Sequence, residues 1–139
     1  MLIFDSFNDV LSEVARAADL CLKPWKHSVL LDPTLDAQEI VAGQLSELIL
    51  RVECRDLEGK RHSQNDLEIE IFRSGSDLNI TLAWCEFPLR PILWQGKHSL
   101  WMDSQTGQRI LTTPANGEQL EAFSRRLRTY FANSLKIDQ

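Results

Sequence analysis

Hydrophobic and polar residues alternate through the second half of the chain, between residues 66 and 112. The alternation is interrupted at short intervals by Ser74-Gly75, Gly96-Lys97 and Thr106-Gly107. A period of two that is broken by such turn residues is typical of strands in an antiparallel meander. The expected strands cover residues 67–73, 78–85, 92–95, 99–103 and 109–112.

An earlier stretch alternates in the same way and predicts a strand over about 45–55. Its apolar face would carry Leu48, Leu50, Val52 and Cys54. If this strand pairs with 67–73, the arginines of one strand share the opposite face with the glutamates of the other, which favours the pairing. These residues are Arg51, Arg55, Glu68 and Glu70.

The segment between residues 25 and 44 allows more than one interpretation. His27 to Leu31 fits a short strand, and the residues from Asp36 to Gly43 fit a helix of about two turns. Several apolar residues after 39 also fit a longer helix. We expect the short helix followed by the strand over 45–55.

A period of 3.6 residues marks a helix near each end of the chain. The first should run from about Asp5 to Leu22, with Ser6 and Asp9 as a capping pair, and Pro24 should stop it. Its apolar stripe is Phe7, Val10, Leu11, Val14, Ala18 and Cys21.

The last helix should begin near Asn116, which forms a capping pair with Gln119. Its stripe is Leu120, Phe123, Leu127, Tyr130, Phe131 and Leu135.

This order of elements predicts one α+β domain over residues 1–139. An antiparallel meander of about four to six strands would be flanked by an N-terminal and a C-terminal helix. The helices would cover one face of the sheet.

Composition and charge fit a globular domain in the cytoplasm. The chain is 43% hydrophobic and 25% charged, and its net charge of −5 argues against a general nucleic-acid-binding surface. No apolar run reaches the length of a membrane span, and the first residues lack the features of a signal peptide. We therefore expect no membrane and no nucleic-acid partner.

The cysteines and histidines do not form a metal-binding pattern. Cys21, Cys54 and Cys85 lie far apart without a C-x-x-C motif, so we interpret them as reduced thiols that pack as small hydrophobes. His27, His62 and His98 also lack the spacing of metal ligands, and His62 lies in a polar loop. We expect no metal and no cofactor.

One cluster of uncommon side chains in the meander is a candidate pocket. It consists of Trp84, Trp94, His98, Trp101 and Asp103. In a functional interpretation, His98 acts in acid–base chemistry and Asp103 orients it. In the alternative, the tryptophans fill space between sheet and helices, with Trp94 and Trp101 as near cross-strand neighbours over the Gly96-Lys97 turn.

Two further features have a functional and a plain interpretation. Arg125, Arg126 and Arg128 form a candidate patch for an anion or an acidic partner, but a solvated helix face explains them as well. The Cys85-Glu86 pair suggests a thiol nucleophile only if a base lies beside it, and the sequence provides no orienting third group.

The segment P-I-L-W-Q-G-K-H-S-L-W-M-D, residues 91–103, resembles small uncharacterised proteins of cyanobacteria. The resemblance covers about a third of the chain. It implies a cystatin-like arrangement, in which a helix packs in a curved antiparallel sheet. The inhibitory motifs of cystatins, Q-x-V-x-G and a Pro-Trp pair in a late hairpin, are missing, so the resemblance implies no protease-inhibitor role and assigns no residue a role.

These observations leave two hypotheses for function. The first is a non-enzymatic interaction module that forms a homodimer, since catalytic motifs are lacking and an exposed sheet edge or face favours self-pairing. The second is a small-molecule-binding protein or enzyme with a pocket near Trp84, Trp94, His98 and Trp101. Whether the chain is an enzyme stays open.

Overall fold

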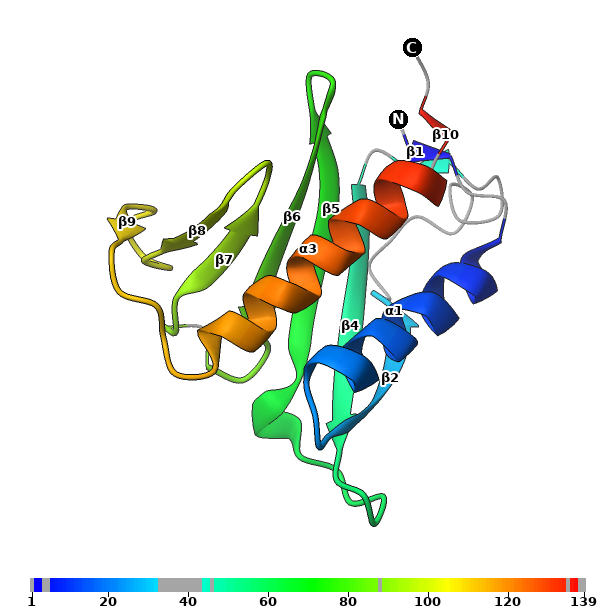
Figure 1. The fold of residues 1–139 in the computed structure, drawn as a ribbon, viewed down its shortest axis with the longest axis vertical. Helices are drawn as coiled ribbons and strands as arrows, with labels where there is room; N and C mark the ends of the chain where they lie inside the picture. Colours follow the sequence, from blue (N-terminus) through cyan, green and yellow to red (C-terminus); the bar gives the residue numbers. More distant parts are fainter. Residues whose placement is uncertain are drawn as a thin grey trace.

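The chain folds as an α+β domain, as the sequence predicts. The computed structural model describes residues 2–3, 6–32, 44–45, 47–87, 89–134 and 136–137. Its main sheet has seven antiparallel strands in the order β2-β4-β5-β6-β7-β8-β9 (Figure 1). These are β2 (Lys26–Leu31), β4 (Glu47–Arg55), β5 (Leu67–Ser74), β6 (Asp77–Trp84), β7 (Ile92–Gln95), β8 (Ser99–Met102) and β9 (Arg109–Ile110).

The remaining elements are two α-helices, a 3-10 turn and a small sheet. The helices are α1 (Phe7–Cys21) and α3 (Gly117–Ser134), and the 3-10 turn is η1 (Ser63–Asn65). The small sheet has the order β10-β1-β3, and its strands are β1 (Leu2–Ile3), β3 (Gln44–Leu45) and β10 (Lys136–Ile137).

The main sheet has more strands than the four to six that we predicted. The additional strand is β2, which pairs with β4 along its whole length, from Lys26 opposite Arg55 to Leu31 opposite Leu50. Val29 of β2 is buried in the core. The sequence predicted a short strand here from His27 to Leu31, and the observed strand begins one residue earlier. The helix expected over 36–43 lies outside the described residues, as does Leu135.

The predicted pairing of β4 with β5 is confirmed, and the arginines and glutamates share the face away from the core. Arg51 lies directly opposite Glu68, whereas Glu70 lies opposite Ile49 and Arg55 opposite Lys26 of β2. The buried faces also fix the alignment, since a shift of one residue would expose the buried side chains of Leu48, Leu50 and Val52.

The N-terminal helix begins and ends where the sequence indicates. The Ser6 hydroxyl accepts a hydrogen bond from the Asp9 backbone N–H at 3.3 Å, which satisfies one of the donors that lack a helical partner. The helix ends at Cys21, and the Leu22 N–H donates to the Ala18 carbonyl at 2.8 Å. Pro24 follows, and β2 starts two residues later.

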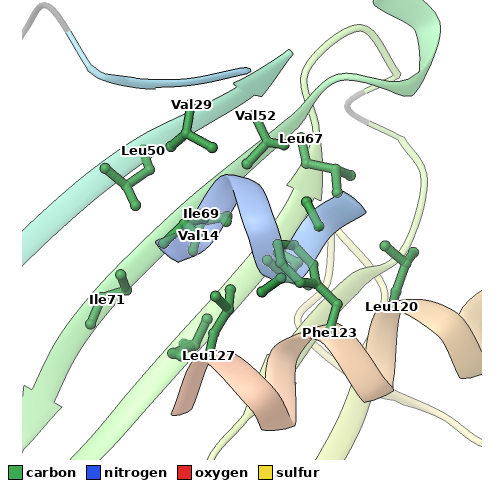
Figure 2. Packing of buried hydrophobic residues seen from close by; sticks show 14 of the residues in the cluster. Val14, Val29, Leu50, Val52, Leu67, Ile69, Ile71, Leu120, Phe123 and Leu127 are labelled. Atoms are coloured by element: carbon green, nitrogen blue, oxygen red, sulfur yellow. The ribbon is translucent and has the colours of Figure 1, made fainter. Parts of the chain in front are cut away.

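Both helices pack on the same face of the sheet, where they enclose the core. Figure 2 shows sheet residues such as Leu50 and Ile69 facing Val14 of α1 and Phe123 and Leu127 of α3. A polar contact also joins the layers, in which the buried Ser124 hydroxyl of α3 donates to the Gln95 side-chain oxygen of β7 at 2.8 Å. None of the helices in the described ranges is long and apolar enough to cross a membrane.

Candidate ligand-binding cavity

The structure brings together two of the five residues of the predicted pocket. Trp84 and Trp101 stack on the helix side of the sheet, with ring centroids 6.3 Å apart and an interplanar angle of 24°. Trp101 is buried and lies close to the start of α3, where a Cβ on Gly117 would come within 3.2 Å of its ring. A Cβ at residue 117 would also collide with the side chain of Thr113, so a side chain here would force its neighbours to move.

The other three residues lie elsewhere. Trp94 lies on the opposite face of the sheet, where its Nε1–H donates to the Asn79 side-chain oxygen at 3.1 Å. His98 is exposed in the β7–β8 hairpin loop, and Asp103 follows the far end of β8. The predicted orientation of His98 by Asp103 therefore has no support in the structure.

Asp103 has a role in its own turn. Its carboxylate accepts hydrogen bonds from the backbone N–H groups of Gln105 at 2.8 Å and Thr106 at 3.0 Å. The bonds from Thr106 and Gln105 lower the pKa of Asp103, because they stabilise the ionised form. The carboxylate thus holds the turn between β8 and β9.

The three arginines of the predicted patch also differ from one another. Arg125 and Arg126 are exposed on α3. Arg128 is half-buried, and its Nε–H donates to the Leu78 carbonyl of β6 at 3.0 Å. Arg128 therefore fixes the helix to the sheet, and only Arg125 and Arg126 remain fully available to a partner.

A cavity of about 450 Å³ lies where the C-terminal end of α1 and the N-terminal end of α3 meet one end of the sheet. Trp84 is the one residue of the predicted pocket that lines it. The lining residues come from separate parts of the chain and are Leu22, Trp25, His27, Cys54, Asn65, Leu67, Trp84, Arg90, Pro91, Pro114, Ala115, Asn116, Gln119 and Leu120.

Arg90 forms a distinctive part of the cavity wall. Its guanidinium carbon lies 5.3 Å from the centroid of the Trp84 ring and 4.4 Å from that of Phe87. A cation over an aromatic ring is attracted by the ring itself, which leaves the N–H groups of the guanidinium available to other partners. Within the described residues, the Arg90 side chain makes no hydrogen bond and no ion pair.

His27 connects β2 to α1 at the inner end of the cavity. Its Nδ1 lies 3.0 Å from a carboxylate oxygen of Asp19, and its side chain is only 3% exposed. Burial lowers the pKa of His27, and the hydrogen bond and charge of Asp19 offset only part of this effect. The imidazole is therefore mainly neutral at pH 7, which limits its use as a cationic ligand group.

Cys54 lies beside His27 in the cavity lining but has no activated thiol. Burial and the negative charge of Asp66 raise the pKa of Cys54 to about 11. Because the thiolate is the nucleophile, a thiol with this pKa is inert at neutral pH. Burial also raises the pKa of Cys85, on the other face of the sheet. The cavity thus offers groups for binding rather than for covalent catalysis.

An ion pair between Arg61 and the buried Asp66 supports this end of the sheet. The Asp66 carboxylate is fully buried and accepts two hydrogen bonds from Arg61, at 2.6 and 2.9 Å, and one from the Cys54 backbone N–H at 2.8 Å. Burial favours the neutral acid, but these bonds and the Arg61 charge outweigh it, so the pKa of Asp66 is lowered. Asp66 thus holds β4 against the start of β5.

Most of the cavity was missed in the sequence because its residues belong to no common pattern. Trp25 follows Pro24, and Arg90 stands between two prolines, so both lie in irregular segments that periodicity does not describe. An aromatic residue and an arginine outside the predicted elements were the available signals. Among the described residues, no group of three or more His, Cys, Asp and Glu is arranged to hold a metal ion.

A family model for a domain of unknown function, DUF8659, matches residues 11–130. The chain belongs to the DUF8659 family. All residues that line the cavity, from Leu22 to Leu120, lie within the part that defines this DUF8659 domain. No curated protein and no solved structure matches the chain. The resemblance to small cyanobacterial proteins, with its cystatin-like arrangement, therefore stays a prediction.

Proposed function

We propose that this DUF8659 chain is a small-molecule-binding protein whose ligand occupies the cavity between α1, α3 and the sheet. The observation that carries the proposal is the convergence of apolar and polar groups around one volume of about 450 Å³. Ligand sites commonly have volumes of roughly 300–1,000 Å³ and combine apolar walls with a few oriented polar groups.

The two kinds of lining group have separate roles. Trp25, Trp84, Leu67 and Leu120 offer apolar surface to the body of a ligand. The three amide side chains offer both hydrogen-bond donors and acceptors and therefore orient it. They belong to Asn65, Asn116 and Gln119.

A screen of small aromatic compounds by thermal unfolding tests this proposal. A ligand that binds only the folded chain stabilises it by about 2.7 kcal/mol at one hundred times its Kd. In Ala115→Trp, the new side chain fills the cavity entrance and abolishes the stabilisation. Ala132→Trp is the matched control, because Ala132 is exposed near the other end of α3. A compound that stabilises both variants equally binds elsewhere, and a screen with no stabilising compound contradicts the proposal.

The second candidate function is self-association through the face of the sheet that the helices do not cover. We call it the helix-free face. The pairing of the strands places several partly buried apolar residues there, and Leu30 is 47% exposed. The partly buried residues are Ile49, Phe72, Ala83, Ile92, Trp94, Leu100 and Met102. Partly exposed apolar residues on a sheet face are typical of interaction sites, and here Ile92, Trp94, Leu100 and Met102 lie together on β7 and β8.

The charges on the helix-free face favour a second copy of the chain as its partner. Arg51 and Glu68 lie side by side on neighbouring strands. In a twofold dimer, each contact occurs twice, so Arg51 of one copy can pair with Glu68 of the other.

Light scattering over a range of concentrations tests this second candidate. Leu30→Glu and Ile92→Glu should shift the dimer to monomer, whereas Leu57→Glu, at a 71% exposed position in a hairpin loop, should not. A wild-type chain that stays monomeric at every concentration contradicts self-association.

A cytoplasmic location is also part of the proposal. Cys21, Cys54 and Cys85 are all free thiols, and Cys54 is buried. Unpaired cysteines are the usual state in a reducing compartment, which supports this location.

A further inference from the structure

The charge of the cavity lining differs from that of the whole chain. The chain has 20 acidic and 15 basic residues, yet none of the described residues that line the cavity is an Asp or a Glu. Among these described lining residues, Arg90 is the only one with a permanently charged side chain. The local electrostatic environment therefore favours a negative group, although the chain as a whole is acidic.

The hydrogen-bonding capacity of Arg90 is largely unused. A guanidinium has five N–H donors, and its planar edge fits the two oxygens of a carboxylate or a phosphate. The guanidinium lies over the rings of Trp84 and Phe87, and a contact of this kind does not occupy the N–H donors. Arg90 is exposed and has no acceptor among the described residues, so its donors are accessible to an anionic ligand group.

The surroundings of Arg90 indicate the shape of such a ligand. Trp25 and Trp84 offer flat aromatic surfaces, and Pro91, Pro114 and Leu22 extend the apolar lining. Aromatic rings bury large areas against flat partners. His27 is mainly neutral and already bound to Asp19, so the cavity provides one cationic group rather than two.

We propose that the cavity binds a planar apolar molecule with one anionic group, which forms charge-assisted hydrogen bonds with Arg90. The inference rests on the proposed ligand-binding function and adds the chemical class of the ligand. A carboxylate and a phosphate share the required chemistry.

Arg90 also lines a second cavity, whose other lining residues include acidic side chains. This cavity, of about 350 Å³ on the helix-free face, is lined by Trp84 and Arg90, but it contains Glu68 and Glu70 as well. Burial, with the charges of Glu47 and Glu68, raises the pKa of Glu70, as expected where negative charges crowd together. An anionic ligand is disfavoured there, so Arg90 should bind it from the helix side.

Isothermal titration calorimetry with three naphthalene compounds tests the inference. The compounds are 2-naphthoate, 2-naphthyl phosphate and the neutral 2-naphthalenemethanol. At least one anion should bind the wild-type chain about tenfold or more tightly than the alcohol, since hydrogen bonds to charged groups are the stronger kind. The tighter of the two anions shows which acidic group the cavity accepts. Added salt should lower the affinity for the anion and leave the affinity for the alcohol unchanged.

Substitution of Arg90 separates charge recognition from general binding. Arg90→Gln should reduce the affinity for the anion to that for the alcohol, while the alcohol keeps its affinity. Arg90→Lys should give an intermediate affinity for the anion, because it keeps the charge and loses the planar edge. Arg126→Gln is the control, since Arg126 is exposed on α3 and does not line the cavity. It should change neither affinity.

The outcomes distinguish this inference from the function on which it rests. If the alcohol binds as tightly as both anions, or if Arg90→Gln weakens all three equally, the anionic class is wrong and the cavity remains a neutral ligand site. The compound screen can still give ligands whose stabilising effect is abolished in Ala115→Trp. If it does and none of the three naphthalene compounds binds, only the anionic class is overturned. If the screen also gives none, both proposals fail.

Discussion

Removal of Arg61 should destabilise the fold more than its surface position indicates. The Asp66 carboxylate is 0% exposed, whereas the Arg61 side chain is 31% exposed. In Arg61→Ala, two hydrogen bonds to the carboxylate disappear, and only the one from the Cys54 N–H remains. A buried charge that loses its partner costs about 3–5 kcal/mol. Water reaches the position of Arg61, so we expect a loss near the lower end, about 3 kcal/mol.

Urea unfolding at pH 7, followed by tryptophan fluorescence, measures this loss. Thermal unfolding gives a second measure of the loss. For a chain of this size, 1 kcal/mol corresponds to about 4 °C in Tm, so the Tm of Arg61→Ala should fall by roughly 12 °C. Arg126→Ala is the control, because Arg126 is exposed and has no buried partner in the described part of the chain. The double variant Arg61→Ala with Asp66→Asn should be more stable than Arg61→Ala alone, since it buries no charge.

The dependence on pH gives a second test of the same reasoning. The pKa of Asp66 is lowered in the wild-type fold, so the stability that the pair provides is present above the unfolded pKa and is lost as the pH falls through the folded pKa. Without Arg61, burial should raise this pKa, so the folded variant should take up a proton before the unfolded chain does. The difference between wild type and Arg61→Ala should therefore shrink from pH 7 to pH 4. A loss below about 1 kcal/mol, or effects of the two substitutions that simply add, would refute the role of the pair.

Three further predictions concern His27, Cys54 and Phe123. Because the pKa of His27 is lowered in the fold, the unfolded chain binds more protons below pH 6.5, and stability should decrease as the pH falls from there to the folded pKa. In His27→Gln, denaturant unfolding should show a weaker pH dependence in that range, and an unchanged slope would contradict the assignment. Cys54, with a pKa raised to about 11, should resist alkylation at pH 8 until the chain unfolds, as mass spectrometry of digested samples can show; rapid labelling of the folded chain would disprove this. Phe123→Ala should cost about 3–5 kcal/mol in urea unfolding, and the exposed Thr129→Ala should cost little. A similar cost for both would show that Phe123 is not a central core residue.

The regular elements were largely predictable because their periodicity reports burial directly. Leu48, Leu50 and Val52 alternate and are all buried in β4, and the Ser6 cap and the Ser74-Gly75 turn lie where the sequence places them. The ligand-binding cavity was not predictable in this way. Periodicity shows which side of an element faces the core, but a cavity is a place where packed elements leave space. Its lining joins Trp25, Arg90 and other residues that are far apart in the sequence.

Two tryptophans of the predicted pocket, Trp94 and Trp101, lie on opposite faces of the sheet because of the hairpin between β7 and β8. Gln95 pairs with Ser99, so residues 96–98 form the loop, and Leu93 therefore lies opposite Trp101. Trp94 lies opposite Leu100, on the other face of the sheet. A register shifted by one residue would have placed the two tryptophans on the same face of the sheet, because successive side chains in a strand point to opposite faces. The Gly96-Lys97 pair indicated a turn but not whether the loop has two residues or three. The length of one loop thus decides that Trp101 stacks on Trp84 beside the cavity, while Trp94 joins the apolar helix-free face.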